Sequence, residues 1–142
     1  MNSFLYVCSR PSLDISAAAG VIGFHDSVPT LNRILAEVQV GDRVYVYVTK
    51  EMRLAAYARV TREVFLDVSP IFAGVSNGEV FARRIGIAVE RDDLAIPFRD
   101  IVVPKLTDLF PPNRKAIFSA YLVRQFIRLS PGDAAALERL VS

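Results

Sequence analysis

One stretch near the end of the chain combines basic and aromatic residues in a pattern that could hold nucleic acid. Residues 109–129 read LFPPNRKAIFSAYLVRQFIRL and include no acidic residue. The basic residues are Arg114, Lys115, Arg124 and Arg128, and the aromatic ones are Phe110, Phe118, Tyr121 and Phe126. Positive side chains neutralise phosphates and exposed rings stack on bases, so the composition suits a binding surface. It suits equally a core strand with a charged fringe, in which the rings are buried.

The spacing within this stretch predicts one face of each kind. Successive side chains of a strand point to opposite faces, so rings three residues apart cannot share a face. Phe118 and Leu122 are therefore predicted to lie in the core, whereas Tyr121 and Arg124 are predicted to lie at a cleft or on the surface.

Arg114 and Lys115 directly follow the prolines at 111 and 112. Two positive charges on a rigid edge can bind phosphates without reading a sequence. The alternative is an ordinary solvated loop, and the sequence leaves both interpretations open.

Residues that could perform catalysis or hold a metal are few. His25 is the only histidine and Cys8 the only cysteine, so no internal disulfide can form and a zinc site is not expected. Cys8 ends an apolar run, which is typical of an inert buried thiol. Asp92 and Asp93 are adjacent, and neighbours in a turn face different ways instead of forming an acid and base pair. We therefore expect no catalytic residue, no metal and no cofactor.

The length and composition indicate one globular domain. The chain has 142 residues, 52% of them hydrophobic, which is enough for a core. Its net charge of +2 does not by itself indicate a polyanionic partner, but residues 101–142 hold six basic and three acidic residues. The start lacks the pattern of a secretory signal, and no run approaches the ~18 apolar residues of a membrane span. We expect no membrane partner and a cytoplasmic location.

The periodicity of apolar residues predicts an α+β fold. A short apolar run predicts a strand over 3–9, and alternating patterns predict strands over 39–49, 53–67 and 80–90. Apolar stripes with capping residues predict helices over 12–20, 30–38 and 129–141, with Ser12, Thr30 and Ser130 as N-caps. Residues 96–106 are ambiguous between helix and strand, and 116–126 are interpreted as one or two strands. With two helices between the first two strands, we expect a curved, mostly antiparallel sheet that closes partway to a barrel.

The order of these segments resembles the EVE domain of the PUA-like superfamily, which is related to YTH and ASCH domains. A strand ending near SR, a short helix, a V-x-G turn and a second helix precede VGDRVYVYVT. The resemblance continues through ARVTREVFLDVSPIF, ARRIGI, PKLTDLFPPNRKAIF and RLSPGDAAAL. It covers nearly the whole chain and implies a single domain over 1–142. The implied fold is a distorted, mostly antiparallel β-barrel flanked by short helices, with a cleft that receives a nucleobase.

The resemblance also implies binding residues. Ser9 and Arg10 match the polar residues after the first strand, Phe72 matches the ring of the SPI-aromatic loop, and Arg84 matches a single arginine within a strand. In such a cleft, a ring supplies the stacking platform and polar groups choose the base.

The chain departs from the family pattern where a base would stack. Related EVE sequences often have tryptophan where this chain has Leu13 and Ile22, and the chain contains no tryptophan. Aliphatic side chains can pad a base but lack the flat polarisable face of a ring. Phe24 could replace a lost ring, because it lies two residues after Ile22.

The predicted function is a non-catalytic nucleic-acid-binding module that uses a basic cleft, with single-stranded or modified RNA as the ligand. One alternative is an interaction or scaffold domain that kept the fold and lost the pocket, and another is a small nucleoside hydrolase. A cleft filled by Leu13, Ile22 and Phe24, or arginines scattered over separate faces, would argue against the basic cleft, whereas an apolar patch and self-association would indicate the scaffold. The predicted binding residues are Ser9, Arg10, Phe24, Phe72, Arg84, Arg114, Lys115 and Arg124.

Overall fold

The computed structural model describes residues 1–25, 30–113, 122 and 125–142. The strands are β1 (Ser3–Cys8), β2 (Val21–Phe24), β3 (Arg43–Val48), β4 (Arg53–Leu66), β5 (Arg83–Arg91), β6 (Ile96–Pro97) and β7 (Phe126–Arg128). The helices are α1 (Arg10–Ala19), α2 (Leu31–Ala36), the π-helix η1 (Phe98–Val102), the 3-10 helix η2 (Val103–Lys105) and α4 (Pro131–Val141).

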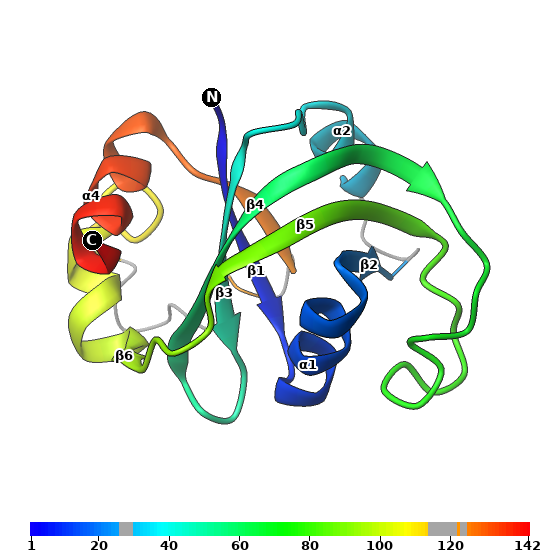
Figure 1. The fold of residues 1–142 in the computed structure, drawn as a ribbon. Coiled ribbons are helices and arrows are strands. Elements are labelled where there is room, and N and C mark those ends of the chain that lie inside the picture. Colours follow the sequence, from blue (N-terminus) through cyan, green and yellow to red (C-terminus); the bar gives the residue numbers. More distant parts are fainter. Residues whose placement is uncertain (26–29, 114–121, 123–124) are drawn as a thin grey trace.

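These strands form one curled sheet in the order β2-β5-β4-β3-β1-β7, with β6 paired to β4. Among the described strands only β1 and β3 run parallel, and the other pairings are antiparallel. Figure 1 shows the long β4 and β5 arching over α1 and β2, with α4 on the opposite side of the sheet. The predicted α+β fold, a mostly antiparallel half-barrel with flanking helices, is confirmed.

The central strands β1 and β3 are buried because both of their faces are covered. Phe4 and Tyr6 point into a core that the curled sheet encloses with α1 and α2. Leu5 and Tyr45 point the other way, into a second core covered by η1, η2 and α4. The sheet therefore separates two apolar layers, and its interior strands lack the alternation between polar and apolar faces that a half-exposed strand shows.

The first helix begins earlier than predicted. Its N-cap is Ser9, whose Oγ accepts a hydrogen bond from the Ser12 backbone N–H at 3.3 Å, so the assignment of Ser12 as the cap was wrong. Pro11 sits in the first turn, where its missing N–H costs nothing. Gly20 ends the helix as predicted, with a φ of 72° in the left-handed region.

We expected two helices in succession after the first strand, but a short strand, β2, lies between α1 and α2. It pairs with β5, from Val21 opposite Gly86 to Phe24 opposite Arg83. The sequence did not predict β2 because four residues are too few to show the alternation of a strand. The strand is defined by its pairing with β5, which is distant in the sequence. The residues that the family resemblance singled out near Ile22 are therefore part of the sheet.

The closing helix follows the prediction closely. The Oγ of Ser130 accepts from the Asp133 backbone N–H at 3.1 Å, and Leu137 is fully buried. The Asp133 carboxylate is also buried and accepts from the backbone N–H groups of Asp108 (3.2 Å) and Leu109 (2.8 Å). Burial raises the pKa of this carboxyl above its usual range. The helix start is thereby tied to the segment that follows η2.

The far end of β4 extends beyond the core. Pairing with β3 stops at Arg59, so residues 61–66 pair only with β5 and are mostly exposed. The register shifts between Val60 and Arg62, opposite Gly86. A Cβ on Gly86 would meet the Arg62 Cβ at 2.7 Å and the Thr61 Oγ1 at 2.8 Å. This bulge thus needs glycine as its partner.

We predict that Gly86→Ala lowers the free energy of unfolding by about 1–3 kcal/mol, because the added methyl overpacks the bulge. Gly74→Ala is the matched control, since a Cβ there meets nothing within 4 Å. Urea unfolding of both variants measures the difference. Equal stability of the two variants would contradict the role assigned to the bulge.

Candidate nucleic-acid interface

The long loop between β4 and β5 is fixed by one buried arginine. The Arg84 side chain is 1% exposed, and its Nε donates to the Phe81 carbonyl at 3.0 Å. Its Nη1 donates to the Ser69 Oγ at 2.7 Å and lies 3.4 Å from the Asp67 carboxylate. Its Nη2 donates to the carbonyls of Ser69 and Val80. The guanidinium group has five N–H donors, and this arrangement offers a partner to each of them.

Asp67 belongs to the same network. Its Oδ1 accepts the Ser69 backbone N–H at 2.8 Å. Hydrogen bonds from Ser69 and the nearby Arg84 charge hold the pKa of the Asp67 carboxyl below its usual range. The carboxylate is therefore ionised at neutral pH and helps to order the start of the loop.

Phe72 is packed inside this loop. It is 1% exposed, and the Arg84 guanidinium carbon lies 5.2 Å from its ring centroid. The ring presses on β2 at Gly23, where a Cβ would come within 2.6 Å of the ring, and it also contacts Phe81. Neither Phe72 nor Arg84 faces solvent here, so a ligand could reach them only if the loop opened. Their role in binding stays a prediction.

The residues expected around a base are also in the core. Leu13 is 3% exposed, and Ile22 and Phe24 are fully buried. The Phe24 ring packs against Tyr6 and Phe126, with centroid distances of 5.8 and 4.9 Å. Apolar packing thus fills the space next to α1 and β2, which argues against a base-binding cleft at these residues. Phe24 is placed as a core ring and not as an exposed platform.

Ser9 and Arg10 lie at the start of α1, away from the loop network. Ser9 is the N-cap, while the exposed Arg10 donates from Nε and Nη2 to both Glu51 carboxylate oxygens, at 2.8 and 2.7 Å. This ion pair joins α1 to the β3–β4 turn and lowers the pKa of Glu51. Of the predicted residues, Phe72 and Arg84 are brought together, and Ser9 and Arg10 form a separate pair.

The remaining predicted residues, Arg114, Lys115 and Arg124, lie outside the described residues, as do Phe118 and Tyr121. The described rings of the basic and aromatic stretch, Phe110 and Phe126, are fully buried. Leu122 is buried as predicted. The described part of the stretch therefore contributes to the core.

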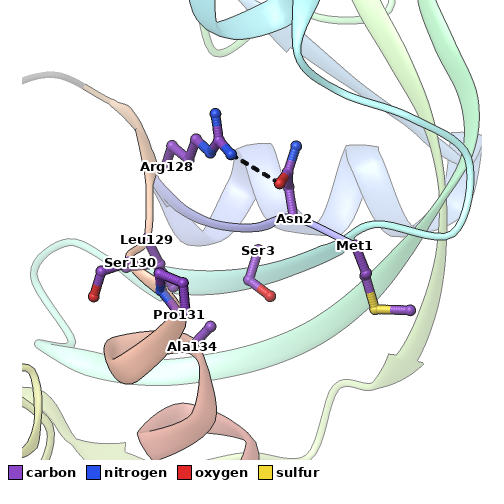
Figure 2. Close-up of a pocket in the computed structure, with 8 residues that line it drawn as sticks. All are labelled: Met1, Asn2, Ser3, Arg128, Leu129, Ser130, Pro131 and Ala134. Carbon is purple, nitrogen blue, oxygen red and sulfur yellow. Dashed lines mark hydrogen bonds between the residues drawn. The ribbon is translucent and has the colours of Figure 1, made fainter.

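Arg128 lines a pocket of about 380 Å³ between the start of β1 and the start of α4 (Figure 2). Its guanidinium donates to the Asn2 Oδ1 at 3.0 Å and to the Glu37 carboxylate at 2.8 Å. The rest of the lining includes Ser3, Leu129 and Pro131. The one arginine in the lining already has a carboxylate partner, Glu37.

An exposed cation and ring that the sequence reading missed lie on the projecting end of β4. The Arg62 guanidinium carbon is 3.7 Å from the centroid of the Phe65 ring, which is half-buried. Phe65 is paired with Arg84 across the sheet, so it lies next to the residue that anchors the buried network. Only the spacing of Arg62 and Phe65 in the sequence could have suggested the pair, and the bulge between them obscures the strand alternation.

The other chemically reactive residues form no catalytic arrangement within the described residues. Burial raises the pKa of the Cys8 thiol to about 12, so the thiol is neutral and poorly nucleophilic. The Nε2 of His25 lies 2.8 Å from the Oε1 of Glu79. In the same part of the chain, no group of three or more His, Cys, Asp or Glu side chains could hold a metal. No helix there is long and apolar enough to cross a membrane.

The fold is shared with solved structures of nucleic-acid complexes. The YTH domain of Zygosaccharomyces rouxii MRB1 in complex with N6-methyladenosine RNA superposes with a TM-score of 0.68 at 12% identity, covering 98% of this chain and 83% of that one. Human THYN1 in complex with 5-methylcytosine-containing DNA superposes with a TM-score of 0.67 at 12% identity, covering 99% and 97%.

A hypothetical protein from Leishmania major is similarly close, with a TM-score of 0.67, 15% identity and coverage of 99% and 94%. No family model matches the sequence, and no curated protein matches it significantly. At these identities the likeness establishes the fold. The chain shares its fold with these YTH and THYN1 structures.

We predict that Arg84→Met lowers the free energy of unfolding by about 3 kcal/mol or more, because buried acceptors lose bonds to a charged donor that are worth roughly 1.5–3 kcal/mol each. Residues 67–82 should also lose protection in hydrogen exchange. Arg99→Met, at an exposed position on η1, is the control. Unchanged protection of the loop in Arg84→Met would show that the network does not fix it.

Proposed function

We propose that this protein is a non-catalytic module that binds single-stranded RNA. The observation that carries the proposal is the exposed Arg62 stacked on Phe65 at the projecting end of β4. Bases of unpaired RNA stack on aromatic rings and on guanidinium planes, and cations hold the adjacent phosphates. Two solved structures with this fold are complexes with nucleic acid, which supports the proposal at the level of ligand class.

In this proposal the buried residues position the platform. Arg84 and Phe72 hold the 67–82 loop against β2. Phe65 of β4 pairs with Arg84 of β5, which places the platform next to this loop. Arg10, Arg114, Lys115 and Arg124 remain predicted phosphate contacts. Among the described residues, Leu13, Ile22 and Phe24 are packed in the core and form no aromatic cage, so we expect the strand to be held along its backbone and on the Arg62 platform.

A second candidate function is supported by exposed apolar residues in the same region. Leu66 and Val68 are each 77% exposed, and Val64, Ile71 and Val80 are also exposed. All five belong to the end of β4 or to the loop that follows it. Large exposed apolar patches mark association sites, so an interaction module would use this region to contact protein.

We predict that the protein binds a labelled single-stranded RNA with an affinity that falls as salt rises, because phosphate contacts release counterions. Arg62→Ala should weaken binding roughly fivefold or more, the cost of losing one stacking contact. Arg99→Ala, at an exposed position on η1, is the matched control. Fluorescence anisotropy at several salt concentrations measures both. Equal weakening by the two variants would contradict the assigned platform.

Sedimentation of the free protein tests the second candidate. A monomer that binds RNA supports the proposed function. A concentration-dependent dimer that Leu66→Asp dissociates, together with no RNA binding at low salt, would replace it with the interaction module.

We further predict that RNA strands with and without N6-methyladenosine bind with equal affinity. The region where the family resemblance places a base is packed with aliphatic and core aromatic side chains, so a methyl group gains no cage. Competition anisotropy with strands identical except for the methyl group measures the ratio. A clear preference for the methylated strand would show that the packed region opens on binding.

A further inference from the structure

A second polar pocket lies where the end of α4 meets the middle of the sheet. It has a volume of about 280 Å³, and its chemically active lining residues are Arg43, Tyr45, Tyr57, Glu90, Arg91 and Glu138. The pocket is separate from the Arg62 platform. Tyr57 and Arg62 are five positions apart on β4, roughly 17 Å along an extended strand.

Two tyrosines from neighbouring strands provide an aromatic wall. Tyr45 of β3 and Tyr57 of β4 are paired in register, and their ring centroids are 5.2 Å apart with a 39° angle between the planes. Tyr45 is buried, whereas Tyr57 is half-buried and so is the ring that a ligand can reach. Burial raises the pKa of Tyr45 to about 12 and also raises the pKa of Tyr57. Both rings are therefore neutral at physiological pH.

The charged groups of the pocket balance one another. Arg43 binds Glu138 of α4 with 3.0 Å between Nη1 and Oε1. Glu90 binds Arg59 at 3.1 Å, and Arg91 donates to Asp93 at 2.9 Å and to the Val141 carbonyl at 3.0 Å. A strongly charged ligand would gain little from these four side chains of the pocket, because each of them already has a partner of opposite sign.

The ligand that suits this lining is neutral and flat, with donors and acceptors at its edge. Its face would stack on Tyr57, its acceptor atoms would meet the arginine N–H groups, and its donors would meet the carboxylates. The volume lies just below the ~300–1,000 Å³ of pockets for drug-sized ligands, which favours a fragment of one ring system and its substituents.

We propose that this pocket binds a nucleobase stacked on Tyr57. A free nucleoside and an unpaired base within a strand share the required chemistry. The inference does not rest on the proposed function, because the pocket can take a nucleoside whether or not a strand binds at Arg62.

The test is a titration of the isotope-labelled full chain, followed by amide chemical shifts, with adenosine, guanosine, cytidine and uridine in turn and then with a short single-stranded RNA. We expect saturable shifts in the amides around Tyr57, Glu90 and Glu138. Shifts caused by free nucleosides assign the pocket to nucleosides, and shifts caused by the strand alone assign it to a base within RNA. Absence of shifts in the pocket with all of these ligands overturns the proposal.

Variants separate this site from the Arg62 platform. Tyr57→Ala should weaken the ligand roughly tenfold or more, because it removes the stacking ring, while Tyr57→Phe should bind like the wild type. Arg62→Ala should leave nucleoside affinity unchanged. Glu90→Gln, on the rim, provides a second test if Tyr57→Ala fails to fold, and it should weaken at least one nucleoside. Wild-type affinity in Glu90→Gln and in a folded Tyr57→Ala would overturn the proposal.

Discussion

The buried guanidinium of Arg84 is the interaction on which the candidate interface depends. A charge this deeply buried is costly unless every donor is satisfied, and here the acceptors come from both ends of the 67–82 loop and from Asp67. The loop therefore adopts a conformation that suits one arginine. Phe72 is carried with it onto Gly23, where the absence of a Cβ makes room for the ring.

This constraint explains why the region differs from an open aromatic cleft. Aromatic residues near β2 serve as packing groups, and the space beside α1 is filled by Leu13 and Ile22. We therefore expect a ligand at the exposed end of β4. There the Arg62 guanidinium lies over the ring of Phe65, and Phe65 is the cross-strand partner of Arg84. The β4–β5 ribbon projects beyond the core because β3 begins at Arg43, opposite Arg59, so the end of β4 pairs only with β5. We therefore expect the ligand to bind at the projecting end of β4 and β5.

Local signals allowed much of the fold to be predicted. The end of α1 at Gly20 and the N-cap of α4 at Ser130 follow from the preferences of single residues for these positions. The strands β3 and β4 were predicted from residues that alternate along the chain. β2 was missed because it is short and is defined by pairing with β5. Arg84 was singled out through a family resemblance as a ligand contact, but its acceptors are mostly backbone carbonyls of a loop. No pattern of residue types shows which carbonyls will converge on a side chain.

The most direct test of the central claim is to locate where RNA touches the protein. Photo-crosslinking of a single-stranded RNA containing 4-thiouridine, followed by mass spectrometry of the peptides, reports contact sites without assuming them. The account predicts crosslinks on the peptides that contain Arg62 and Phe65 and on the adjoining 67–82 loop. Crosslinks confined to other surfaces, or none under conditions in which the strand binds, would contradict it.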